Sequence, residues 1–177
     1  MFSAFFNRYL YVFDYFGFAV SMCYDGNSMV VGAKFDVSPG SSAGSVEVYE
    51  YSSGSWTKMG STINGEAASD QFGWSVSMNG AGTRIVVGAN QNDGNGSNSG
   101  HVRIYDWNGT AWTQVGADID GENINNESGR AVSMNNDGNI IALPGLLNSV
   151  QTISFALNKT NSPPSYCLLY TSPSPRD

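Results

Sequence analysis

A glycine-containing segment recurs along the 177-residue chain at a fixed interval, and this repeat constrains the fold more than any other feature. The clearest copy, residues 72–89, reads Phe-Gly-Trp-Ser-Val-Ser-Met before a turn and Ile-Val-Val-Gly-Ala after it. Residues 16–33 and 129–143 are further copies. The shared glycine falls at positions 17, 73 and 129, so both intervals are 56 residues. A period without drift indicates a protein built from one recurring supersecondary unit.

The first half of each copy predicts two strands joined by a turn. Residues 18–22 alternate between larger apolar side chains and the small Ala19 and Ser21, which is the period of a β-strand. The small residues would let a neighbouring sheet approach closely. Asp25-Gly26 and Asp137-Gly138 predict two-residue hairpins with positive φ at the glycine. The next strand, residues 29–31 or 85–87, is apolar on both faces and should be covered on both sides.

The second half of each copy predicts two more strands. A loop rich in Gly, Ser, Asn or Pro precedes a third strand at residues 44–49 or 100–105. A turn then leads to a fourth strand at residues 56–60 or 112–116. Residues 63–66 would link to the next copy.

Four short strands per copy, without helical periodicity, predict antiparallel meanders, which at this spacing are the blades of a β-propeller. A β-trefoil has a similar period but would not give a strand apolar on both faces in every copy. The predicted fold class is an all-β partial β-propeller of four-stranded antiparallel blades. The expected divisions are an unassigned apolar segment 1–13, blades at 14–69 and 70–125, a partial third blade at 126–149, and a tail at 150–177. We expect the tail to lie outside the repeat and not to be native to it.

Composition excludes some classes of function. The net charge of −7 argues against nucleic-acid binding, which needs a basic face. No stretch is apolar for long enough to predict a membrane span. Cys23 falls on a predicted strand, where a buried free thiol is expected, and with Cys167 it gives neither a disulfide framework nor a zinc spacing.

Two motifs carry a family resemblance. Phe16-Gly17 with Gly32-Ala33, and Phe72-Gly73 with Gly88-Ala89, resemble the FG-GAP repeat, which builds the propeller at the head of integrin alpha chains. The resemblance covers roughly residues 14–145. It implies a β-propeller fold. Because a propeller needs about four to eight blades to close, two full copies and part of a third predict a fragment whose partners include the remaining blades of a longer parent chain.

The sequence departs from the family pattern in two respects, its motif residues and its calcium loop. Lys34 and Asn90 stand where the proline of the triplet is expected, and Ser128 replaces the phenylalanine in the third copy. The calcium loop D-x-D-x-D-G-x-x-D of many integrin-type repeats is absent, because only short turns join the first two strands. Such turns are too tight to supply six to eight oxygen ligands, so the resemblance to this short-turn variant does not imply calcium.

Three sets of polar residues are candidate sites. Residues 90–95 resemble a calcium loop but hold one carboxylate, so a surface loop is expected. His101 has no recurring nucleophile beside it, and a surface histidine is expected. Asp14 and Asp70 precede Phe-Gly in two copies and are expected to cap a turn rather than act in acid–base chemistry.

Trp56 and Trp112 begin the predicted outer strand. They could stack on a sugar, although packing between strands is expected for large residues at a fixed repeat position.

The sequence therefore predicts no catalytic, cofactor-binding or metal-binding residue and no cofactor. The leading hypothesis is a non-enzymatic interaction or adhesion module, extracellular or at the cell surface, with an unknown protein or glycan ligand. The alternative is a carbohydrate-binding, lectin-like propeller. A catalytic propeller would need polar residues converging on the central axis, where the sequence offers Ala, Ser, Val and Met.

An open arc of blades should expose apolar end faces, for which Met29, Val31, Val132 and Ile141 are the expected residues.

Overall fold

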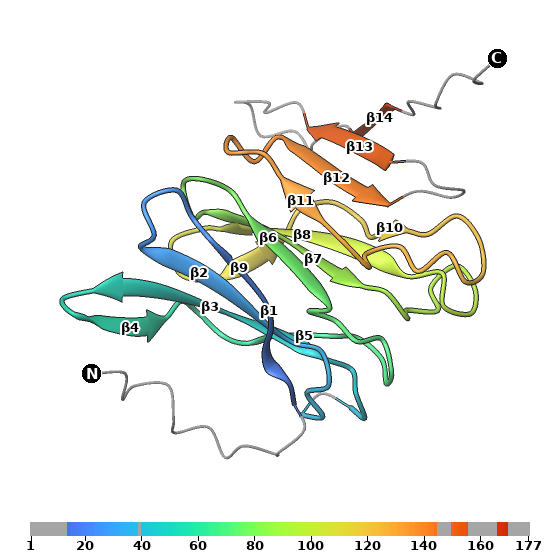
Figure 1. Ribbon diagram of the computed structural model, residues 1–177, viewed down its shortest axis with the longest axis horizontal. Helices are drawn as coiled ribbons and strands as arrows, with labels where there is room; N and C mark the ends of the chain where they lie inside the picture. Colours follow the sequence, from blue (N-terminus) through green and yellow to red (C-terminus); the bar gives the residue numbers. More distant parts are fainter. Residues whose placement is uncertain (1–13, 39, 145–149, 156–165, 170–177) are drawn as a thin grey trace.

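The computed structural model of the chain describes residues 14–38, 40–144, 150–155 and 166–169. The named elements in these residues are all β-strands, and they pair antiparallel. The strands form three sheets that follow one another along the chain and stack face to face (Figure 1). The predicted all-β class with antiparallel four-stranded sheets is confirmed. In the described residues, no helix is long and apolar enough to cross a membrane.

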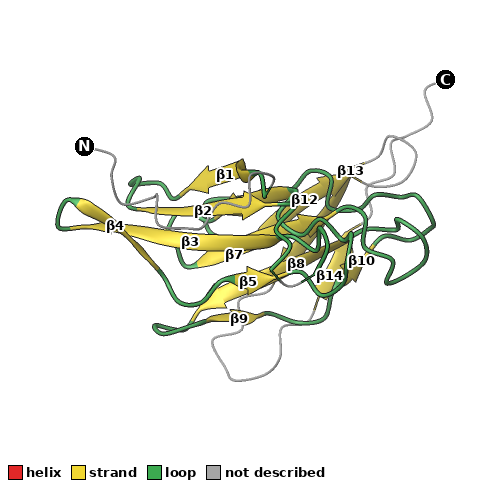
Figure 2. Cartoon of the chain, turned by 90° about the horizontal axis from the view of Figure 1, so that it is seen from below, coloured by secondary structure: helices red, strands yellow, loops and turns green. Residues whose placement is uncertain are grey.

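The first two sheets have the same plan. Their strands are β1 (Phe16–Met22), β2 (Ser28–Ala33), β3 (Ser45–Ser52), β4 (Ser55–Lys58) and β5 (Ile63–Asn64), then β6 (Ser75–Met78), β7 (Arg84–Ala89), β8 (His101–Trp107), β9 (Trp112–Gln114) and β10 (Ile119–Asp120). In each sheet the first three strands pair in order, and the third strand then pairs with two short segments along its outer edge. Residues 63–64, expected to be a link, thus form the second of these edge segments, because Ile63 pairs with Val46. The β3–β4 hairpin extends beyond the rest of its sheet (Figure 2).

The third sheet contains β11 (Ser133–Met134), β12 (Ile140–Pro144), β13 (Val150–Phe155) and β14 (Tyr166–Leu169), paired in that order. The last two strands correct the division drawn at residue 149, since they lie in the segment expected to be outside the repeat. Residues 150–155 read Val-Gln-Thr-Ile-Ser-Phe and are rich in the β-branched and aromatic residues that favour strands. They pair with β12 in the register Ile141 to Ile153.

The first hairpin is longer than predicted. The Cys23 N–H donates to Ser28 O at 3.0 Å, which leaves residues 24–27 as a four-residue loop rather than a two-residue turn. Gly26 has a φ of 73° and Gly138 a φ of 71°, so the predicted positive φ at glycine is confirmed. Cys23 is a buried free thiol, as expected, and its Sγ donates to Asp25 Oδ1 at 2.9 Å.

Apolar side chains fill the space between consecutive sheets. The first interface combines Val30, Val46 and Val48 of the first sheet with Met78 and Ile85 of the second. The second interface is built in the same way from the far face of the second sheet and the near face of the third. Its buried members are Val86, Val102, Ile104, Ile141 and Leu143.

The small residues of the first strands do allow close approach, as predicted. Ser21 Oγ accepts the Met78 N–H at 3.1 Å, and Ser77 Oγ accepts the Met134 N–H at 3.0 Å. The same hydrogen bond therefore joins each sheet to the next, one repeat apart.

Glycine is required where the sheets are closest. A Cβ placed on Gly32 would lie 3.1 Å from the carbonyl carbon of Gly73 and nearer still to its oxygen. Gly88 has the same relation to Gly129, with 2.7 Å to the carbonyl carbon. The glycine one residue before the end of β2 or β7 thus packs on the backbone of the Phe-Gly glycine, or its equivalent, in the next copy, where a side chain would force the sheets apart.

Lys34, which stands at the expected proline position, links the first two sheets by a different contact. Its ammonium group lies 3.6 Å from the ring centroid of Phe18 and 3.9 Å from that of Trp74. Cation–π attraction of this kind strengthens when the charge is shielded from water, and burial also lowers the pKa of Lys34.

The outer face of the first sheet is open, and of the predicted residues Met29 lies on it, half-buried and opposite Met22. Val132 and Ile141 pack against the second sheet, and Val31 is buried. The exposed residues are Phe18, Val20 and Met22, whose exposed fractions are 43%, 61% and 50%. The prediction was wrong for Val132 and Ile141 because they are the repeat equivalents of Val76 and Ile85, which lie on the covered side.

Candidate functional site

His101 is the first residue of β8 and is not the surface histidine that was expected. Its backbone pairs with Ala89 of β7 and Asp120 of β10, and its side chain is 1% exposed. Neither ring nitrogen has a hydrogen-bond partner. Burial, assisted by the positive charge of Arg103, lowers the pKa of His101 to about 4, so the ring is neutral at pH 7.

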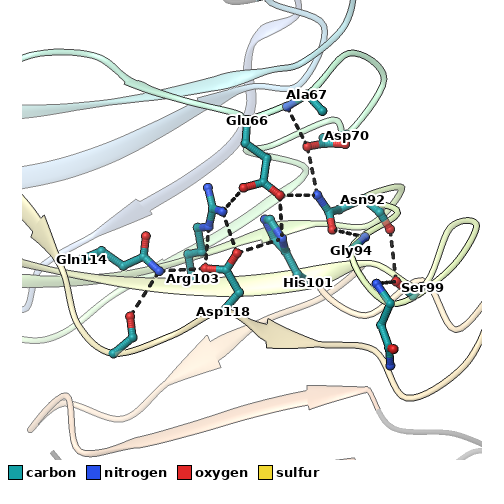
Figure 3. A network of polar contacts seen from close by, with 12 residues as sticks. Glu66, Ala67, Asp70, Asn92, Gly94, Ser99, His101, Arg103, Gln114 and Asp118 are labelled. Atoms are coloured by element: carbon teal, nitrogen blue, oxygen red, sulfur yellow. Dashed lines mark hydrogen bonds and ion pairs between the residues drawn. The ribbon is translucent and has the colours of Figure 1, made fainter.

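Two carboxylates face this ring (Figure 3). Asp118 Oδ2 lies 3.7 Å from His101 Nδ1, and Glu66 Oε1 lies 4.0 Å from the same nitrogen. Asp118 immediately precedes β10, whereas Glu66 lies in the segment between β5 and β6. The site is therefore assembled from a strand of the second sheet, the edge of that sheet, and the connection from the first sheet.

Arg103, two residues after His101 on β8, holds both carboxylates. Its Nε and Nη2 donate to Asp118 at 2.8 and 2.6 Å, and Nη2 also contacts Glu66. Two amides complete the support, with Gln114 donating to Asp118 at 2.7 Å and Asn92 donating to Glu66 at 2.9 Å.

Both carboxylates are therefore ionised at neutral pH. The hydrogen bond from Arg103 lowers the pKa of Asp118. Burial opposes ionisation of Glu66, but the hydrogen bonds from Arg103 and Asn92 outweigh it and leave its pKa lowered as well.

More negative charge lies around this group. Burial raises the pKa of Asp120, and the nearby charges of Asp118 and Glu66 raise it further. Burial likewise raises the pKa of Asp70, with smaller contributions from Glu66 and Asp93. The carboxylates thus crowd one another, and adding a positive charge to this region would be favourable.

Asp70 has the structural role that was predicted. Its Oδ2 accepts the Ala67 N–H and the Asn92 amide, each at 3.0 Å. The loop at residues 90–95 is also held by its own hydrogen bonds. Asn92 Oδ1 accepts the Gly94 N–H at 2.8 Å, and Asp93 Oδ1 accepts the Asn98 N–H at 2.7 Å. These hydrogen bonds fix the shape of the loop.

The two tryptophans that could stack on a sugar, Trp56 and Trp112, differ in their surroundings. Trp112 packs against the first interface, and its indole N–H donates to Met59 O at 3.1 Å. Trp56 lies on the extended β3–β4 hairpin, where its ring is 5.3 Å from that of the exposed Tyr51.

Comparison with known proteins identifies the repeat. Residues 62–105 match the FG-GAP repeat family, and this match includes the Phe72-Gly73 and Gly88-Ala89 motifs. No curated protein matches the chain.

Several solved structures are similar to the chain at low sequence identity. A candidate 6-phosphogluconolactonase from Bacteroides fragilis matches with a TM-score of 0.53 and 14% identity, covering 76% of this chain and 33% of its own. A second, from Bacteroides uniformis, matches with a TM-score of 0.53 and 14% identity, covering 90% of this chain and 42% of its own. TolB from Acinetobacter baumannii matches with a TM-score of 0.45 and 14% identity, covering 85% of this chain and 31% of its own.

The chain thus spans well under half the length of the solved structures that it matches. At this identity the likeness shows the fold alone, which is that of a β-propeller. The chain therefore contains an FG-GAP repeat at residues 62–105, and its three stacked sheets form part of a β-propeller.

Proposed function

We propose that the chain is part of a non-enzymatic β-propeller that serves as an interaction or adhesion module at the cell surface or outside the cell. The observation that carries the proposal is the open face of the first sheet. Val20 and Met22 are the repeat equivalents of Val76 and Met78, which are buried against the neighbouring sheet. The first sheet thus presents to solvent the face that other blades of this chain use for packing. A further blade of the same parent protein is the partner with the matching shape.

The loop ends of the blades are the surface on which an external ligand would bind. Polar residues of small size fill these loops, as in residues 90–99, and loops positioned by a rigid scaffold commonly carry binding functions. The FG-GAP match favours a protein ligand, since the integrin alpha resemblance implies that class of partner.

A non-enzymatic role is favoured by the surroundings of His101. A general base acts on a nucleophile or a substrate proton within hydrogen-bond reach. The polar groups around His101 are Glu66, Asp118 and Arg103, none of which is a hydroxyl or thiol nucleophile. The matching test is hydrolysis of 6-phosphogluconolactone, the activity named for two solved structures of the same fold. We expect no rate above spontaneous hydrolysis, and a rate that His101→Ser abolishes would overturn the non-enzymatic proposal.

Location and adhesion are tested on the organism that makes the protein. An antibody raised against the 177-residue chain should label intact cells or the culture medium, and the soluble chain should compete with cell adhesion to coated surfaces. Labelling only after the cells are permeabilised would contradict the extracellular location.

Carbohydrate binding is the second candidate, and the Tyr51–Trp56 pair is the observation that favours it. Two aromatic rings on a protruding hairpin form a surface on which a sugar could stack. A glycan array probed with the chain separates the two candidates. Saturable binding that is lost in Trp56→Ala, but kept in Trp112→Phe, would favour the lectin function.

A further inference from the structure

We infer that His101, Glu66 and Asp118 form a binding site for a divalent transition-metal ion of the zinc class. The site lies between the first two sheets of the FG-GAP propeller and goes beyond the interaction role proposed above. It takes one ligand atom from each residue, namely His101 Nδ1, Glu66 Oε1 and Asp118 Oδ2.

The spacing of the three atoms matches the coordination shell of such an ion. They lie within 4.8 Å of one another, with 3.7 and 4.0 Å from the nitrogen to the two oxygens. Ligand atoms about 2.1 Å from a tetrahedral zinc ion are roughly 3.4 Å apart. Rotamer adjustments that shorten the two nitrogen–oxygen distances by roughly 0.3–0.6 Å, and the oxygen–oxygen distance by at most about 1.4 Å, would close the three atoms around one ion.

The imidazole of His101 is the observation that distinguishes this cluster from an ordinary group of acidic residues. It is almost wholly buried, it points at both carboxylates, and neither of its nitrogens has a hydrogen-bond partner. Buried polar groups are nearly always satisfied, so each exception calls for a cause. Because the ring is neutral at pH 7, it offers a nitrogen lone pair, which is the form of histidine that binds metals.

The surrounding groups are those that usually support a metal site. Asn92, Gln114 and Arg103 hydrogen-bond to the two carboxylates and fix their orientation. The guanidinium carries one positive charge against two negative ones. The two carboxylates and Arg103 therefore carry a net charge of −1, which favours a cation.

The ligand set selects the type of ion. One imidazole nitrogen with two carboxylate oxygens suits zinc and its first-row neighbours. Calcium and magnesium prefer oxygen ligands throughout, and calcium needs six or more of them. The side chain of Glu66 is the most exposed of the three ligands, so an ion can enter from its side.

The repeat supplies natural replacements for testing this site. Ser45 and Thr62 occupy the positions of His101 and Asp118 in the first copy, where the same strands form. His101→Ser and Asp118→Thr therefore introduce residues that this fold already accommodates. Glu122→Gln is the matched control, since Glu122 lies one repeat after Glu66.

The experiment is a titration of the chelator-treated full chain with zinc chloride, followed by calorimetry. One zinc ion should bind per chain. Loss of a residue that only hydrogen-bonds to a metal ligand is expected to weaken binding by roughly 10–100-fold. His101→Ser, Asp118→Thr and Glu66→Gln should each weaken zinc binding by more than this. Asn92→Ala should fall within that range. Glu122→Gln should leave the affinity unchanged, and excess calcium should not displace zinc.

Cobalt gives an independent readout that a purely structural role would not produce. Cobalt bound by the chain should show visible d–d absorption with nitrogen and oxygen ligation, and His101→Ser should abolish it while circular dichroism stays native. Cobalt bound by the two cysteine thiols would persist in His101→Ser, so this variant distinguishes thiol binding from binding at the His101 site. No saturable zinc binding by the wild-type chain, or equal affinity in Glu66→Gln and wild type, would overturn the inference.

Discussion

The contact between Gly32 and Gly73 predicts a large effect from a single methyl group. A Cβ on residue 32 would lie 3.1 Å from the Gly73 carbonyl carbon, whereas carbon atoms in contact are about 3.5–4.0 Å apart. The Gly73 oxygen is nearer still, so the first two sheets would have to separate by roughly 0.5–1 Å in Gly32→Ala. The Ser21–Met78 hydrogen bond, now 3.1 Å, would then lengthen towards about 4 Å and be lost.

The expected cost follows from these two effects. Overpacking a tight contact costs about 1–3 kcal/mol, and a lost hydrogen bond adds about 1 kcal/mol. Alanine also restricts the unfolded chain, which offsets about 0.4–1 kcal/mol. We therefore expect Gly32→Ala to lower the free energy of unfolding by about 2–3 kcal/mol, and to lower the melting temperature by roughly 5–10 °C for a chain of this size.

Urea unfolding followed by tryptophan fluorescence measures this change, and hydrogen exchange of residues 74–80 reports the Met78 amide directly. Gly40→Ala is the matched control, because its added Cβ would lie 3.7 Å from the nearest atom, in ordinary contact. Both variants have the same effect on the unfolded chain. If their unfolding midpoints coincide, backbone contact between glycines does not set the spacing of the sheets.

Four further predictions address the turns, the interfaces, metal binding and the open face. Gly26→Val should cost roughly 1 kcal/mol or more, because residue 26 has a φ of 73°, and an unchanged urea midpoint would refute this. Ser77→Ala should remove the acceptor of the Met134 amide, lowering stability by about 1–2 kcal/mol and speeding exchange of that amide. Millimolar calcium should leave the melting temperature unchanged, and a rise of several degrees that Asp93→Ala abolishes would show that residues 90–95 bind it. The chain alone should bind a dye for exposed apolar surface, less so in Val20→Ser. A monodisperse, cooperatively melting monomer without dye binding would contradict an open propeller.

The repeat predicted most of the fold because its physical causes are local. Alternation placed Ser21 on a face of small residues that a neighbouring sheet can approach closely, and the Asp-Gly pairs located the turns. The direction of stacking could not be predicted in the same way. Val20 and Val30 are both apolar and lie on opposite sides of the first sheet, so the pattern does not say which side meets the second sheet.

The candidate site was missed because its residues are far apart in the sequence, and because His101 and Asp118 have no ionisable equivalent in the first copy. Asp118 reaches His101 through the return of the chain along the outer edge of β8, and Glu66 through the connection from the first sheet, and no periodicity reports either approach. One signal was present in the sequence. At positions where the first copy has Ser45 and Thr62, the second copy has ionisable residues. Such departures from a repeat indicate a role that one copy has and the other copies do not share.

The glycine contact between sheets also bears on how such proteins can evolve. At its closest point, the joint between neighbouring blades is made by main-chain atoms, which are the same in every copy. Blades joined in this way need little mutual adjustment of side chains at that point. A copy can therefore be duplicated, deleted or exchanged while the neighbouring sheets keep the same packing contact. Side-chain variation is then free to accumulate elsewhere, as it has at His101, without disturbing the order in which the units assemble.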